Sequence, residues 1–209
     1  MSVWAHGGKL YEVVSTYSLS DNAWQYELSG MTGAPRTGPL IVVVIPDATP
    51  RDGPFTPVEA NHAVVAVADG VTPWPILLRL LRLAEQSGDI VGGQWTRVSA
   101  AETLLSSAVW SHGGRRFGVN SFHFAERGAW CYELYESPSV AGRNDRVEVQ
   151  IPDVQPNGGQ FVPGPAAHAT FTAHGGCDFP WPVFRRFIAA IEVSGDIVEG
   201  DPAAGPAID

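Results

Sequence analysis

The fold is decided by a hexapeptide that occurs twice, as Ala23-Trp24-Gln25-Tyr26-Glu27-Leu28 and again as Ala129-Trp130-Cys131-Tyr132-Glu133-Leu134. In both copies apolar and polar residues alternate, so Trp, Tyr and Leu share one face, as expected for a β-strand with one buried side. The copies lie 106 residues apart. This spacing is typical of an internal duplication.

The repeat extends through most of the chain. Trp-x-His-Gly-Gly occurs at 4–8 and 110–114, and Ile-Pro-Asp occurs at 45–47 and 151–153. Ser-Gly-Asp-Ile-Val occurs at 87–91 and, after one inserted residue, at 194–198. We count 35 identities over 91 aligned positions. We therefore predict two repeats, residues 1–93 and 109–200, joined by a connector at 94–108 and followed by a flexible tail at 201–209.

Each repeat is predicted to form four strands followed by one helix. The strands are expected near residues 9–18, 23–29, 40–45 and 61–68, with counterparts near 115–125, 129–136, 146–151 and 167–174. Pro-Trp-Pro precedes helices expected at 75–87 and 182–194, where a proline is tolerated in the first turn. Strands that precede a helix favour an α+β fold with largely antiparallel four-stranded sheets. We expect the two repeats to pack as a pseudo-dimer.

The third strand differs between the repeats. In the second repeat Arg146, Glu148 and Gln150 alternate with apolar residues, which predicts a solvated outer face. The matching positions of the first repeat are Leu40, Val42 and Val44. We expect another part of the molecule to cover these three side chains, because exposing them forgoes roughly 1.5–3 kcal/mol each. The candidates are the connector, where Leu104 and Leu105 fit a short helix, the second repeat, or a partner.

Composition excludes several classes of protein. The formal net charge is −9, and no basic stripe is present to neutralise phosphates, so nucleic-acid binding is disfavoured. The longest apolar runs are too short to span a membrane, and the first residues do not resemble a signal peptide. The two cysteines, Cys131 and Cys177, have no disulfide or zinc spacing. We expect a soluble cytoplasmic protein without cofactor or metal.

The candidate binding residues lie in two loops and on one strand. Residues 46–61 and 152–167 share a Pro-x-x-Gly-x-Phe-x-Pro frame, which predicts a fixed shape anchored by Phe55 and Phe161. The side chains between these anchors differ, as in a recognition surface. Glutamates on the polar face of the second strand, present in both repeats, are suited to a basic partner. The predicted binding residues are Arg51, Asp52, Glu59, Asn157, Glu27 and Glu133.

Three functions follow as hypotheses. The acidic balance and the lack of recognisable catalytic motifs favour a non-enzymatic protein-binding module, such as an acidic inhibitor or immunity-type protein that occludes a partner. A second hypothesis is an enzyme or small-ligand binder that uses histidines between the repeats, namely His6, His62, His112 and His168. A third is a structural subunit of a larger assembly. Asp47 and Asp153 are interpreted as turn residues.

Overall fold

The architecture is that of an α+β protein with two antiparallel sheets and two helices. The computed structural model describes residues 1–31, 38–51, 53–92, 107–138, 145–156 and 159–198. The first half contains β1 (Ser2–His6), β2 (Lys9–Ser18), β3 (Ala23–Gly30), β4 (Ile41–Pro46), β5 (Val64–Val67), β6 (Gly70–Pro73) and α1 (Trp74–Gln86). The second half contains β7 (Ser107–His112), β8 (Arg115–Phe124), β9 (Ala129–Glu136), β10 (Arg146–Pro152), β11 (Thr170–His174), β12 (Cys177–Pro180) and α2 (Trp181–Ser194).

Each sheet has six strands, so the prediction of four-stranded sheets was wrong. The additional strands are the hairpin partners β1 and β7, and the short strands β6 and β12, which directly precede the helices. Ser107 and Ala108, expected in the connector, already belong to β7. The rest of the connector, with Leu104 and Leu105, and the tail at 201–209 lie outside the described residues.

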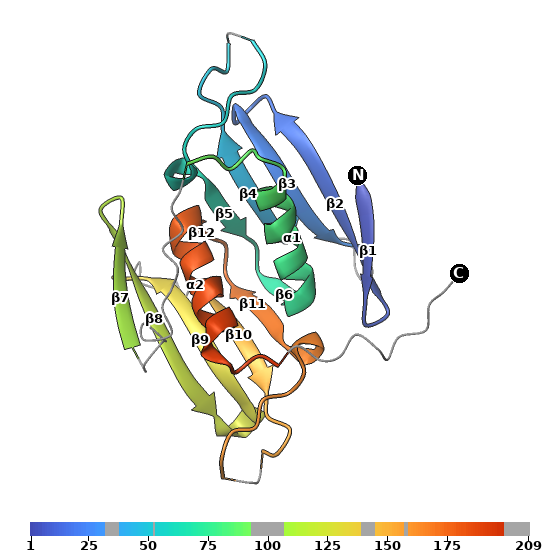
Figure 1. Cartoon of the computed structure of the whole chain (residues 1–209), viewed down its shortest axis with the longest axis vertical. Coiled ribbons are helices and arrows are strands. Elements are labelled where there is room, and N and C mark those ends of the chain that lie inside the picture. The colour runs from blue at the N-terminus through green and yellow to red at the C-terminus, as the bar shows by residue number, and fades with distance from the viewer. Residues whose placement is uncertain (32–37, 52, 93–106, 139–144, 157–158, 199–209) are drawn as a thin grey trace.

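The two halves of the chain exchange one strand (Figure 1). The first sheet has the order β1-β2-β3-β4-β5-β12, and the second has the order β6-β11-β10-β9-β8-β7. β12 pairs with β5 from Cys177 opposite Val67, while β6 pairs with β11 from Pro73 opposite Thr170. Each sheet is therefore completed by a strand from the other half of the chain.

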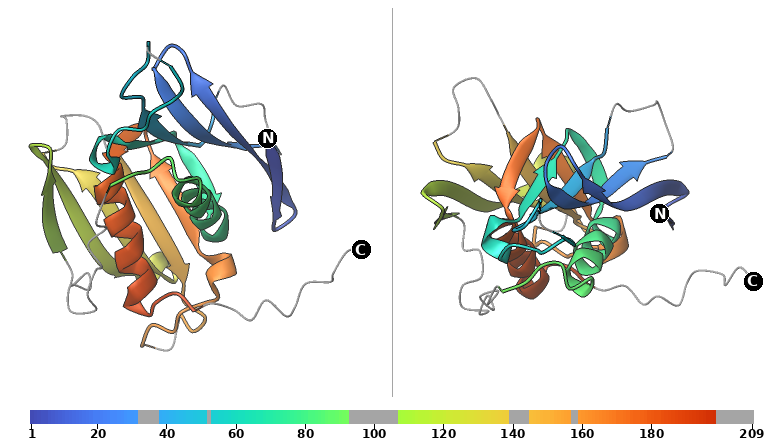
Figure 2. Two further views of the ribbon diagram at one scale, coloured as in Figure 1. Left: turned by 45° about the horizontal axis from the view of Figure 1, so that its top comes forward. Right: turned by 90° about the horizontal axis from the view of Figure 1, so that it is seen from above.

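Both helices cover the same side of the sheets (Figure 2). α1 contacts β6 and β11 of the second sheet as well as β3 of the first, and α2 contacts β12 and β5. The helical spacing of Trp74, Leu77, Leu80, Leu81 and Ala84 places them on one face, and all five are buried. α2 ends at Ser194 and is followed by Gly195, whose φ of 80° is the left-handed conformation that favours glycine after a helix.

Candidate interaction site

The predicted histidines do not come together in one place. His6 of β1 donates from Nε2 to the Ala167 carbonyl at 3.1 Å, and His112 of β7 donates to the Asn61 carbonyl at 3.3 Å. Each of these bonds joins one half of the chain to a short 3-10 helix of the other, Ala166–His168 or Ala60–His62. His62 and His168 are exposed within those short helices. His6 and His112, which the two repeats share, thus each form a hydrogen bond between the two halves of the chain.

The two long loops have the fixed frame that the sequence indicates. Phe55 packs on Trp24 with ring centroids 5.6 Å apart, and Phe161 packs on Trp130 at 5.5 Å. The Asp47 carboxylate accepts the amides of Thr49 and Thr56 at 2.9 and 3.1 Å. These bonds, led by the one from Thr49, lower the pKa of Asp47.

The loops lie at opposite ends of the molecule (Figure 1). Arg51 and Glu59 are exposed in the first loop, whereas Asp52 and Asn157 lie outside the described residues. Because the described parts of the two loops lie at opposite ends, they do not form one surface. Each loop would have to contact a partner separately.

The outer face of the second sheet, on the side away from the helices, carries a polar cluster. Glu148, predicted to be solvated, is only 3% exposed, so that expectation was wrong. Its carboxylate accepts Arg127 Nη1 at 3.4 Å, Gln150 Nε2 at 2.8 Å and His174 Nε2 at 3.3 Å. These donors come from three different segments and cover Glu148. The Glu148 carboxylate therefore has its hydrogen-bond partners within the face.

Cys131 lies in the same cluster and is fully buried. Burial raises the pKa of its thiol to about 12, and the hydrogen bond to Glu148 acts in the same direction. Burial likewise raises the pKa of Cys177 to about 12. Neither thiol is a thiolate near neutral pH, so neither has the character of a catalytic nucleophile.

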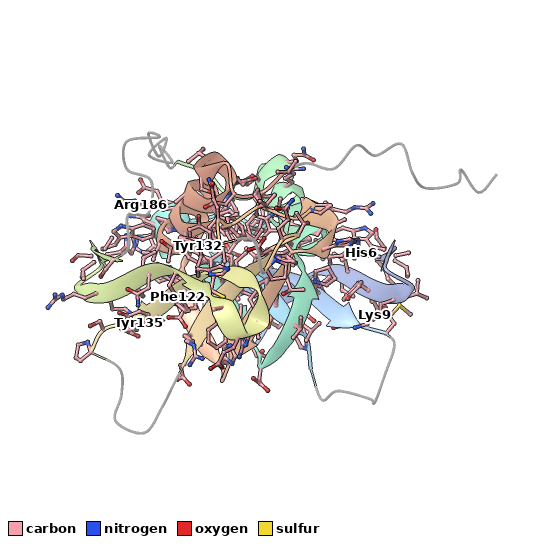
Figure 3. The ribbon with its side chains drawn as sticks, turned by 90° about the horizontal axis from the view of Figure 1, so that it is seen from below. His6, Lys9, Phe122, Tyr132, Tyr135 and Arg186 are labelled. Atoms are coloured by element: carbon pink, nitrogen blue, oxygen red, sulfur yellow. The ribbon has the colours of Figure 1, made fainter. Side chains whose placement is uncertain are left out.

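Figure 3 shows how β9 divides its side chains between the two sides of the second sheet. Tyr132 points toward the helices, while Tyr135 lies on the opposite, outer side with Phe122. The Tyr132 hydroxyl donates to Asp196 just after α2, and burial is the first cause that raises its pKa. Tyr135 lies over Gly118, where an added Cβ would come within 2.3 Å of the ring. Gly118 thus provides the space for the Tyr135 ring.

The outer face of the first sheet is apolar at the matching positions. One row across five paired strands reads Val14, Glu27, Val42, Ala66 and Asp178. The neighbouring row adds Val44 beside Val64. All of these aliphatic side chains are partly exposed. We name Val14, Val42, Val44, Val64 and Ala66 the valine face.

Of the three side chains expected to be covered, only Leu40 is buried, and it lies in the core instead of on the outer face, whereas Val42 and Val44 are partly exposed. Leu40 is 6% exposed and belongs to the core, because it precedes β4 and its side chain lies against Gly30. The side chains of the valine face are therefore only partly covered by the rest of the molecule. Val64 and Ala66 were missed by the sequence analysis, although their alternation with buried Val65 and Val67 was a usable signal.

Glu27 and Glu133 occupy equivalent positions but have different partners. Glu133 forms an ion pair with Arg146 of the next strand, with Nε and Oε1 3.2 Å apart. The residue aligned with Arg146 is Leu40, so the first sheet lacks this cation. Within the part of the chain that the structure describes, the Glu27 carboxylate has no ion-pair partner. It lies between Val14 and Val42 in the register of the sheet.

Among the described residues, no group of three or more His, Cys, Asp or Glu side chains is arranged to hold a metal ion. Over the same ranges, neither helix has the length and apolar character needed to cross a membrane. The fold and this face define a two-sheet α+β protein with partly exposed aliphatic side chains on the outer face of its first sheet. Comparisons with protein-family models, with curated proteins and with solved structures found no match to this chain.

Proposed function

We propose that this chain is a non-enzymatic protein-binding module whose two repeats form a strand-exchanged pseudo-dimer. Its valine face docks onto a basic surface of another protein. The module would act as an acidic cytoplasmic inhibitor of the immunity type, which occludes its partner. The observation that carries the proposal is Glu27, a carboxylate beside an apolar surface whose counterpart Glu133 already has an arginine.

The chemistry of the face supports a partner with apolar and basic groups. Val42, Val44, Val64 and Ala66 offer apolar contact, and a partner that covers them gains about 25 cal/mol for each Å² of apolar surface removed from water. A lysine or arginine of the partner would pair with Glu27, as Arg146 pairs with Glu133. The net charge of −9 favours encounter with a positively charged surface.

The test is an affinity capture from the source cells with the wild-type chain and matched variants. Val42→Glu gives the first sheet the residue that the second has at Glu148, and Glu27→Lys reverses the charge of Glu27. Gln150→Val, at the position that matches Val44, is the control on the second sheet. We expect both first-sheet variants to bind the captured protein about 10- to 100-fold more weakly, because they introduce a buried or like charge at the contact. The control should bind as the wild type does.

Two outcomes would contradict the proposal. A captured protein that binds all variants equally would not use the valine face. Capture of no protein under any condition would contradict the proposal that the chain binds another protein. Solution mass of the purified chain separates the assembly hypothesis, because a structural subunit would associate with itself through this face and Val42→Glu would dissociate it.

A further inference from the structure

A cavity of about 230 Å³ lies between the two helices, on the side of the molecule away from the valine face. Its walls are largely apolar, and one ion pair crosses them, with Arg82 Nη2 and Glu192 Oε1 3.8 Å apart. The residues that line it are Trp74, Pro75, Leu78, Arg82, Ala166, Glu192 and Ile197.

The equivalent place in the other half of the chain is filled by an arginine. Leu78 aligns with Arg185, and Glu192 aligns with Glu85. Arg185 reaches across from α2 to α1, where its Nε donates to Glu85 Oε1 at 2.6 Å, and its Nη1 donates to Glu192 Oε2 at 3.1 Å. Its side chain is 18% exposed. Arg185 therefore pairs with the carboxylates of both helices, whereas the aligned Leu78 offers no such group.

The two repeats differ at two positions that line the cavity. Leu78 is uncharged where Arg185 carries a guanidinium, and Arg82 replaces Ala189 one helical turn further on. Arg82 lines the cavity, and its side chain is 56% exposed. Ala166 is accordingly partly exposed, whereas its counterpart Ala60 is 1% exposed. Oε1 of Glu192 lies 3.8 Å from Arg82 Nη2, and among the described residues it accepts no hydrogen bond.

We propose that this cavity binds the side chain of an arginine presented by a partner protein. The guanidinium would donate to Glu192, and its apolar stem would lie against Trp74, Leu78 and Ile197. The size fits a single side chain, because pockets for drug-sized molecules usually measure about 300–1,000 Å³. Arg185 at the equivalent place shows that the walls suit this chemistry. The inference does not depend on the valine face.

The experiment is an NMR titration of the full chain with N-propylguanidinium, which is the bare arginine side chain. N-propylurea, of nearly the same shape but uncharged, is the control ligand, and N-acetyl-arginine methylamide presents the group on a peptide backbone. We expect the two guanidinium compounds to shift the resonances of Leu78 and Glu192, and the urea to bind at least tenfold more weakly.

Variants test the assignment of the site. Leu78→Arg copies the occupied half and should abolish binding, while thermal unfolding of this variant should show that the fold is retained. Arg82→Ala copies Ala189, removes a like charge, and should strengthen binding by about 3- to 10-fold. Gln86→Ala, exposed on the same helix, should change nothing.

Each contrary result overturns the proposal. Equal binding of the urea would make the cavity merely apolar. Weaker binding by Arg82→Ala would indicate a site for an anion. Binding of N-propylguanidinium without binding of the blocked arginine would exclude an arginine on a protein, and binding of neither would exclude the site.

Discussion

Replacing Phe179 by alanine tests the exchange of strands between the two sheets. Phe179 lies on β12, which belongs to the second half of the sequence but to the first sheet. It is 1% exposed, and its ring centroid lies 6.2 Å from that of Phe117 on β8 and 6.1 Å from that of Phe184 on α2. Removing a buried phenylalanine costs about 3–5 kcal/mol. For a chain of this length the cost lowers Tm by about 6–20 °C.

The assay is urea unfolding followed by hydrogen exchange of both sheets. Because β12 and β6 link the sheets reciprocally, Phe179→Ala should lower the midpoint of β2–β4 and of β8–β10 together, in one transition. Val71→Ala on β6, where the side chain is 57% exposed, is the control and should change stability by no more than about 0.5 kcal/mol. Two separate transitions, with only one half of the chain destabilised, would refute the exchange as a source of cooperativity.

Two further predictions concern thiols and a turn. With thiol pKa values raised from 9.0 to about 12 in the folded chain, Cys131 and Cys177 should react with iodoacetamide at pH 8 roughly a thousandfold more slowly than in urea; equal rates would contradict their burial. Because the unfolded thiols ionise first, the free energy of unfolding should also fall as pH rises from 9 toward 12. Asp153→Ala should lower the free energy of unfolding by about 1–3 kcal/mol, since the amides of Gln155 and Val162 lose their acceptor, and calorimetry showing no change would count against that role.

The sequence pattern predicted the long strands and both helices because their signals are local. β3 alternates from Trp24 to Leu28, and α1 places its apolar residues at helical spacing. β6 and β12 gave no comparable signal, since each has four residues and ends in a proline that also precedes the helix. Their pairing partners lie more than 90 residues away along the chain. No local pattern contains information about such a partner.

The candidate site was predicted in part for the same reason. Glu27 could be identified by comparing the two hexapeptides. That it lacks the cation of its counterpart became clear only from the contact of Arg146 with Glu133 on the neighbouring strand. The burial of Glu148 could not be predicted from the alternation of its own strand. Arg127, which covers it, belongs to the short helix Ala125–Arg127, which precedes the neighbouring strand β9. The cavity depends on a comparison of Leu78 with Arg185 across the helix pair.

The exchange of strands also sets an order of events during synthesis. β5 ends at Val67, yet Cys177, the residue that pairs with it, emerges from the ribosome 110 residues later. At about 5–20 residues per second, the edge of the first sheet stays open for roughly 5–20 s. An open edge can pair with any other extended chain. The interval between the synthesis of β5 and that of β12 is therefore the period in which this edge is exposed to pairing with another extended segment.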